Sequence, residues 1–210
     1  MSGQLIYVMG PSGAGKDSLL GFARERVPGE PVLFAHRYIT RPAGNGENHI
    51  ALTPEEFETR SALGLFALEW SSHALRYGIG IELDAWLARG CTVVVNGSRQ
   101  HLREALTRYP QAVVVHVDAA PHILEARLGA RARETTEQVA ARLARRAPFA
   151  VPEGVTLTTI DNSGALRRRR PRVRRSRAQG GAGLKLNHVL PGVQLTVSRC
   201  HAFAMRIETL

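Results

Sequence analysis

The chain has 210 residues, of which 44% are hydrophobic, and a formal net charge of +10. This length predicts one domain with a sizeable core. Because no run approaches eighteen apolar residues and a charged loop follows the first strand, the sequence argues against a membrane span or a signal peptide and predicts a cytoplasmic protein. The two cysteines, Cys91 and Cys200, match no metal spacing, which argues against a zinc site or a disulfide framework.

The positive charge lies at one end of the chain. Residues 1–166 contain 17 basic and 17 acidic side chains, whereas residues 167–210 contain 11 basic and 1 acidic. The high pI is therefore a property of the C-terminal segment, and it gives little reason to expect that the folded part binds nucleic acid.

The clearest functional signal is a glycine-rich stretch near the beginning. The apolar run 5–9 predicts a buried strand, and it leads into Gly10-x4-Gly15-Lys16, the spacing of a phosphate-binding loop followed by a helix. Glycines let successive amides point at a polyphosphate, and the Lys16 ammonium is expected on the β and γ phosphates of ATP. The expected nucleotide-binding residues are Gly10, Pro11, Ser12, Gly13, Ala14, Gly15, Lys16, Asp17 and Ser18.

The residue after the lysine departs from this pattern. It is normally Ser or Thr, whose hydroxyl binds Mg2+, and here it is Asp17. A carboxylate can hold the metal directly or through water, so Asp17 is the candidate metal ligand. An acidic residue in a first helical turn is also a simple partner of the helix dipole.

The remaining sequence alternates between predicted strands and helices. Helices are expected where apolar residues recur at helical spacing up to turn signals such as Pro28-Gly29 and Gly90, and Thr53-Pro54 marks a helix start. The expected helices cover about 16–27, 54–62, 82–89, 102–109, 121–131 and 135–146. The expected strands cover 5–9, 32–38, 65–70, 74–79, 92–95, 112–117 and 155–160, with 65–70 and 74–79 forming a hairpin beside the main sheet. This alternation predicts an α/β protein with a parallel sheet and helices on both faces.

Polar clusters follow four of these strands and begin at Gly10, Arg37, Asn96 and Asp161. Because ligands of parallel α/β sheets bind at the carboxyl ends of the strands, we expect these clusters to meet in one crevice.

A phosphate-binding loop alone does not separate a hydrolase from a transferase. The Asn-Lys-x-Asp motif with which switch-type GTPases read guanine is missing from the sequence. A kinase for a small phosphorylated acceptor needs an anion pocket opposite the loop and arginines that close over the transferring group. The candidates for the anion pocket are Arg37, Arg41 and Tyr77. The candidates for the lid are Arg127, Arg131, Arg133, Arg142 and Arg145.

Over roughly residues 3–163 the sequence resembles the guanylate kinase family. The shared motifs are the loop 10–16, Thr40-Arg41-Pro42 with Gly46-Glu47, Glu69-Trp70, Tyr77-Gly78 and the lid arginines. The resemblance implies a three-layer P-loop fold with a small acceptor-binding insertion at about 37–80 and an arginine-bearing lid at about 127–146.

Three departures from that family argue against a guanine acceptor. The family has an aromatic residue after the Gly-Glu pair, an Asp at the end of the central strand and a small hydroxyl residue after the Tyr-Gly pair. This chain has His49, Asn96 and Ile79-Gly80 there. Several of those positions serve guanine recognition.

The sequence is more similar to the branch of ribose 1,5-bisphosphate phosphokinases of phosphonate breakdown. The similarity rests on Gly-Lys-Asp-Ser at 15–18, Arg-Tyr-Ile-Thr-Arg-Pro at 37–42, Gly-Glu-Asn-His at 46–49, Val-Asn-Gly-Ser-Arg at 95–99 and Arg-Ala-Arg-Glu at 131–134. It implies transfer of the γ-phosphoryl group of ATP to the 1-phosphate of ribose 1,5-bisphosphate, giving 5-phosphoribosyl 1-diphosphate and ADP. In that branch an Asp after the lysine is usual.

These motifs define the expected site, with MgATP as the donor and a small sugar phosphate as the acceptor. The expected catalytic residues are Lys16, Arg131 and Arg133. The expected acceptor-binding residues are Arg37, Arg41, Glu47, His49, Glu69, Tyr77 and Asn96. Two alternatives stay open at this point: a guanylate or other nucleoside monophosphate kinase, and a non-catalytic nucleotide- or nucleic-acid-binding module.

The sequence changes character at residue 167, so we expect a kinase domain over 1–166 and a separate tail over 167–210. Eight arginines lie within residues 167–177, and such a run predicts disorder. One explanation is a basic arm for nucleic acid or acidic partners. The explanation we favour is a shifted reading frame or other non-native extension, because the arginines begin in the middle of a family motif.

Overall fold

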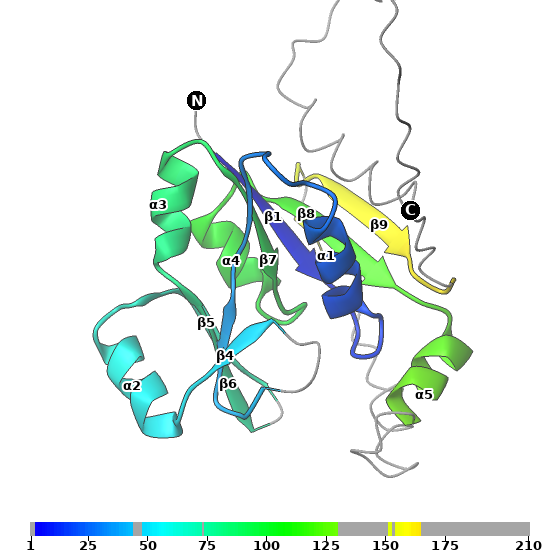
Figure 1. Cartoon of the computed structure of the whole chain (residues 1–210), viewed down its shortest axis with the longest axis horizontal. Helices are drawn as coiled ribbons and strands as arrows, with labels where there is room; N and C mark the ends of the chain where they lie inside the picture. The colour runs from blue at the N-terminus through cyan, green and yellow to red at the C-terminus, as the bar shows by residue number, and fades with distance from the viewer. Residues whose placement is uncertain (1–2, 44–47, 73, 130–150, 153, 165–210) are drawn as a thin grey trace, which may run out of the picture.

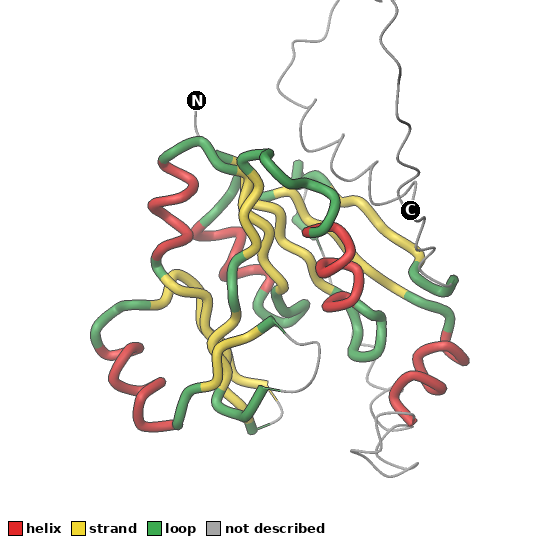
Figure 2. Tube along the Cα trace, viewed as in Figure 1, coloured by secondary structure: helices red, strands yellow, loops and turns green. Residues whose placement is uncertain are grey.

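The protein is represented by a computed structural model, which describes residues 3–43, 48–72, 74–129, 151–152 and 154–164. Five strands form a parallel sheet in the order β2-β7-β1-β8-β9 (Figures 1 and 2). Their bounds are β1 Gln4–Met9, β2 Val32–Phe34, β7 Thr92–Asn96, β8 Val113–Asp118 and β9 Leu157–Asp161. The predicted parallel sheet is confirmed, and β1, which carries the phosphate-binding loop, is its middle strand.

Helices cover both faces of this sheet, because the side chains of each buried strand alternate between two cores. Leu5, Tyr7 and Met9 of β1 face a core shared with helices α3 (Glu82–Ala88) and α4 (Leu102–Arg108). Ile6 and Val8 face a second core shared with α1 (Lys16–Arg24) and α5 (Pro121–Gly129). The predicted three-layer architecture is therefore confirmed.

A second, four-stranded sheet in the order β4-β3-β6-β5 lies beside the first. Its strands are β3 Arg37–Ile39, β4 His49–Ala51, β5 Phe66–Ser72 and β6 Leu75–Gly80. The predicted hairpin is β5 and β6, which pair antiparallel. Helix α2 (Pro54–Ala62) covers this sheet, and the ring of its buried Phe57 stacks on Phe66 at 4.5 Å. As the sequence predicts, Thr53 is the N-cap of α2, and its side chain accepts a hydrogen bond from the Glu56 amide at 3.1 Å.

The expected single strand over 32–38 is wrong, because the chain changes sheets in the middle of it. Strand β2 ends at Phe34, the amide of Ala35 still donates to Val94 O at 3.0 Å, and β3 then begins at Arg37 in the second sheet. This crossing delivers Arg37 to the space between the two sheets. The sequence also gave no indication of the three-residue strand β4. Within the described ranges, every helix is too short or too polar to cross a lipid bilayer.

Candidate functional site

The phosphate-binding loop has a backbone that requires glycine at two positions. A Cβ on Gly10 would lie 2.0 Å from the carbonyl oxygen of Val117, so only glycine fits where the chain leaves β1 beside β8. Gly15 has φ 79° and ψ 23°, a left-handed conformation, and immediately precedes α1. The first turn of α1 therefore follows directly from the loop, an arrangement that is suited to binding anions.

Lys16 places its ammonium over this loop. Its Nζ donates to the carbonyl oxygens of Gly10 at 2.9 Å and Pro11 at 3.0 Å. A positive charge therefore lies at the phosphate-binding loop.

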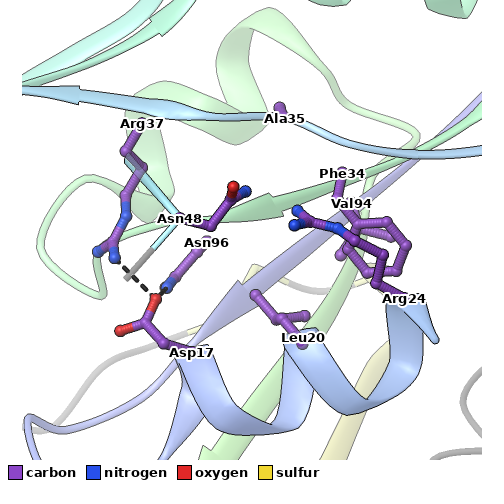
Figure 3. Close-up of a pocket in the computed structure, with 10 residues that line it drawn as sticks. Asp17, Leu20, Arg24, Phe34, Ala35, Arg37, Asn48, Val94 and Asn96 are labelled. Carbon is purple, nitrogen blue, oxygen red and sulfur yellow. Dashed lines mark hydrogen bonds and ion pairs between the residues drawn. The ribbon is translucent and has the colours of Figure 1, made fainter. Parts of the chain in front are cut away.

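Three polar side chains from three different elements meet next to the loop (Figure 3). The Oδ1 atom of Asp17, in the first turn of α1, accepts from Arg37 Nη2 and from Asn96 Nδ2, each at 2.8 Å. Arg37 begins β3, and Asn96 ends β7 and is only 5% exposed. The predicted convergence of the clusters at Gly10, Arg37 and Asn96 is therefore confirmed.

This contact gives a physical reason for two of the sequence departures. In the guanylate kinase pattern the carboxylate ends the central strand and a hydroxyl follows the lysine, whereas here the carboxylate is Asp17 and the strand ends in the amide Asn96. Two carboxylates at these positions would face each other at hydrogen-bond distance and repel. The amide instead donates to the carboxylate, so the two departures compensate each other.

The other side of the loop is held by residues that follow β9 and by α5. The side chain of Asn162 donates from Nδ2 to Ala14 O at 2.7 Å, while its backbone amide donates to Asp118 O at 2.8 Å. The side chain of the preceding Asp161 instead accepts the Ser163 amide at 3.0 Å. Of the predicted cluster at 161–162, the asparagine is therefore the residue that supports the loop.

Arg127 is the one lid candidate that lies within the described residues. An ideal Cβ on Gly15 would lie 3.5 Å from Arg127 Nη1, which is buried and has no hydrogen-bond partner among the described residues. A buried guanidinium nitrogen without an acceptor beside a phosphate-binding loop is suited to a nucleotide phosphate. The other lid candidates, including Arg131 and Arg133, lie outside the described residues, as does Glu47.

Two further acceptor candidates lie close to Arg37 along the chain or across the ladder. His49 is buried on β4, directly opposite Arg37 in the β3–β4 register. Arg41 follows β3, and its Nη1 donates to the neighbouring Pro42 O at 3.1 Å. His49 therefore lies next to Arg37 in the second sheet, while acceptor binding by His49 and Arg41 stays a prediction.

Tyr77 and Glu69 lie on the two strands of the β5–β6 hairpin and have different neighbours. The Tyr77 ring stacks on Trp70 with centroids 5.4 Å apart, and Trp70 stacks in turn on His101, whose pKa is lowered by burial. Glu69 Oε2 instead accepts from Ser61 of α2 at 2.8 Å. The structure therefore does not bring Glu69 to Asp17, Arg37 and Asn96.

Three residues that line a cavity together with Asp17 were missed at the level of sequence. Arg24, Phe34 and Asn48 line the same cavity as Asp17, Arg37 and Asn96. A signal for Arg24 was present, because it lies seven residues after Asp17 and therefore on the same face of α1.

Close relatives of this chain share one name. The chain is 63% identical over 163 residues to ribose 1,5-bisphosphate phosphokinase PhnN of Burkholderia pseudomallei, a match that covers 78% of this chain and 89% of that protein. The chain belongs to the ribose 1,5-bisphosphate phosphokinase family. The PhnN proteins of Thiobacillus denitrificans and Desulfomicrobium baculatum are 56% and 52% identical, over 78% and 90% of this chain and 87% and 97% of theirs. No protein-family model matches the chain.

The fold has a solved counterpart. The crystal structure of guanylate kinase from Anaplasma phagocytophilum aligns with a TM-score of 0.55 and 14% identity, over 75% of this chain and 77% of that one. At this identity the likeness concerns the fold alone. It agrees with the parallel sheet and the flanking helices described above.

Proposed function

We propose that this protein transfers the γ-phosphoryl group of ATP to the 1-phosphate of ribose 1,5-bisphosphate, forming 5-phosphoribosyl 1-diphosphate and ADP. The observation that carries the proposal is the 63% identity to a ribose 1,5-bisphosphate phosphokinase over most of both chains. The contact between Asp17, Arg37 and Asn96 supports it, because these residues belong to the motifs typical of that branch. Because the donor is ATP, we propose that the protein works in the cytoplasm.

On the donor side, the loop 10–18 would bind the phosphates of ATP. The loop amides and the first turn of α1 supply partial positive charge, and the Lys16 ammonium would exchange its two carbonyl contacts for the β and γ phosphates. Arg127 lies beside Gly15 and would add a charge-assisted contact. We propose that Arg131 and Arg133 complete this side from the lid.

The residues present fit a magnesium ion that is bound mainly through the nucleotide. Both hydrogen bonds recorded for the Asp17 carboxylate go to Oδ1, so within the described part of the chain Oδ2 is available to Mg2+ or to one of its waters. No group of three or more His, Cys, Asp or Glu that could hold a metal occurs among the described residues. One carboxylate together with substrate phosphates is the usual environment of Mg2+. When bound, Mg2+ would neutralise charge on the β and γ phosphates.

On the acceptor side, Arg37 would hold the 1-phosphate next to the γ-phosphate. The attacking oxygen belongs to a phosphate that is already ionised at neutral pH, so no general base is required. The protein has to bring two anions together in line and exclude water, which cationic side chains and fixed geometry accomplish. We propose Arg41, His49 and Tyr77 as further acceptor contacts. Glu47, which lies outside the described residues, stays a prediction, and Glu69 is left out because its carboxylate accepts from Ser61 of α2.

The test is an ADP-release assay in which purified protein and MgATP are given ribose 1,5-bisphosphate or GMP. The expected result is ADP formation with ribose 1,5-bisphosphate and 5-phosphoribosyl 1-diphosphate as the product, with much slower turnover of GMP. Turnover with GMP alone would identify a nucleoside monophosphate kinase. If the protein releases no ADP with either acceptor and binds DNA in a salt-sensitive way, the result would support the binding module instead.

We also propose that residues 1–166 form the catalytic unit and that residues 167–210 are dispensable. The charge asymmetry of the sequence supports this division. Truncation after Leu166 should leave ADP release and the yield of soluble protein unchanged. If both collapse, the C-terminal segment is part of the enzyme.

A further inference from the structure

A cavity of about 270 Å³ lies beside Asp17, between α1 and the two sheets (Figure 3). Asp17, Leu20, Gly21 and Arg24 form its wall on α1, and their spacing of three, four and seven residues places them on one helix face. Arg24 therefore lies two helical turns from Asp17, about 10 Å along the helix axis. The wall that α1 contributes to the cavity therefore has Asp17 at one end and Arg24 at the other.

Two guanidinium groups enter this cavity from different elements. Arg37 enters from β3 at the Asp17 end, where the two side chains pair at 2.8 Å. Arg24 enters from the last turn of α1, and its guanidinium carbon lies 5.1 Å from the centroid of the Phe34 ring. Such a cation–π contact can hold the guanidinium in place, and Figure 3 shows the two side chains next to each other.

No acidic side chain in the described ranges pairs with the positive charge at the Arg24 end. Among the described residues that line the cavity, Asp17 is the only one with a carboxylate, and it is engaged by Arg37 and Asn96. No ion pair between Arg24 and an acidic residue occurs in the described part of the chain. A guanidinium in a concave site with no carboxylate partner is suited to an anionic group of a ligand, above all to a phosphate.

Asn96, which lines the cavity, also has an amide oxygen that no described residue engages. Because the Asp17 carboxylate can only accept, the amide nitrogen of Asn96 must face it, and Oδ1 of Asn96 points elsewhere. This oxygen is buried and has no hydrogen-bond partner among the described residues. A hydroxyl group of a ligand would satisfy it.

We infer that this cavity binds a pentose with a phosphate at each end and that Arg24 binds the phosphate that does not react. The reacting phosphate lies at the Arg37 end, close to Lys16 and the phosphate-binding loop. Arg24 then selects doubly phosphorylated acceptors, because a ligand with one phosphate cannot engage both ends. This inference rests on the proposed function, since it assigns the cavity to the pentose bisphosphate of that reaction.

The test removes the guanidinium of Arg24 from the protein and, separately, the second phosphate from the ligand. Calorimetric binding and ADP release are measured with ribose 1,5-bisphosphate and with ribose 1-phosphate, for the original protein and for Arg24→Gln. Loss of one charge-assisted contact should weaken binding of the bisphosphate, and lower its kcat/KM, by about 10- to 100-fold. Binding of ribose 1-phosphate should stay within about 2-fold, and Arg24→Lys should recover part of the loss.

Arg26→Gln is the matched control. Arg26 also lies over an aromatic ring, that of Phe22, but it does not line the cavity. Its replacement removes the same charge and the same kind of ring contact, and it should leave binding of both ligands unchanged.

The outcomes separate this inference from the proposed function. A loss in Arg24→Gln that is confined to the bisphosphate supports the inference, whether or not ADP is released. Equal losses for both ligands, a similar effect of Arg26→Gln, or an original protein that does not bind ribose 1,5-bisphosphate would overturn it. Binding of the bisphosphate without ADP release contradicts the proposed function alone.

Discussion

Replacement of Asn96 by aspartate tests the contact on which the site is built. The two side chains have nearly the same shape, so Asn96→Asp changes the chemistry at one point: an amide that donates to Asp17 Oδ1 at 2.8 Å becomes a second carboxylate. Asn96 is 5% exposed, so the new charge cannot turn into solvent without moving the end of β7. We therefore expect the variant to be less stable than the original protein at pH 8.

The size of the effect follows from the distances. Loss of a hydrogen bond to a charged acceptor costs about 1.5–3 kcal/mol. Two unit charges 2.8 Å apart repel by about 6 kcal/mol at an effective dielectric constant of 20. The Asp17 side chain is 33% exposed and paired with Arg37, and both features reduce the repulsion. A loss of about 2–4 kcal/mol of unfolding free energy at pH 8 is therefore expected.

The assay is urea unfolding at pH 8 and pH 5 of four proteins: the original chain, Asn96→Asp, Asp17→Ser and the double variant. At pH 5 a shared proton relieves part of the repulsion, so the defect of Asn96→Asp should shrink. The double variant restores a single carboxylate, as in the guanylate kinase pattern, and should be more stable than Asn96→Asp by about 2 kcal/mol at pH 8. If Asn96→Asp is fully stable at both pH values, or if the two substitutions are additive, Asp17 and Asn96 are not in contact and the site is built differently.

Three other predictions concern the loop and the packing around it. Lys16→Ala should lower kcat/KM for ADP release by about 10²- to 10³-fold with an unchanged melting temperature, because the ammonium acts on transferring phosphate; a melting temperature that falls with the activity would indicate a structural role. Gly15→Ala should lower the unfolding free energy more than Gly29→Ala, because both glycines have φ +79° but only a Cβ at Gly15 meets the Asn162 side chain, at 2.6 Å. Both variants share a backbone strain of about 1–2 kcal/mol. Equal losses of unfolding free energy in urea would contradict the contact with Asn162. Burial lowers the pKa of His101, so the folded state is disfavoured when this side chain becomes protonated. The stability is fully present above the unfolded-state pKa of about 6.5 and is lost as pH falls toward the folded-state pKa. Between pH 7 and pH 5 the melting temperature should therefore fall less in His101→Gln than in the original protein, and parallel plots of melting temperature against pH would refute this assignment.

The elements that the sequence predicts well are those that carry their own local signals. The helix that starts after Thr53 and the helix that stops before Gly90 lie within one or two residues of their expected positions, because caps and glycines act over a single turn. The run 92–95 is predicted as a buried parallel strand because every residue in it is β-branched and three are fully apolar. In each case the signal and the structure it specifies lie within the same few residues.

What the sequence does not predict depends on contacts between distant segments. Hydrophobic patterning shows that residues 32–38 are extended, but it does not show that the chain leaves one sheet at Phe34 and enters another at Arg37. The pairing of Asp17 with Asn96 joins residues 79 positions apart, and each residue taken alone looks like a departure from a motif. The role assigned to Arg24 requires the tertiary fact that α1 turns that face toward Phe34 and Arg37.

The carboxylate at position 17 and the amide at position 96 have a consequence for the choice of acceptor. A carboxylate in the first turn of α1 is stabilised by the helix dipole, and its negative charge can hold both Arg37 and Asn96. A serine hydroxyl at that position carries no such charge. Asn96, at the end of β7, then donates from its amide nitrogen to Asp17, and its buried amide oxygen can still accept a hydrogen bond. In the binding mode inferred above, an acceptor with hydroxyl groups and two phosphates would use that oxygen and the two arginines. A guanine base, which the related family binds with residues this chain has replaced, would leave Arg24 without a phosphate to bind. The same two substitutions that look like isolated departures in the sequence therefore favour a sugar bisphosphate over a nucleotide as the acceptor.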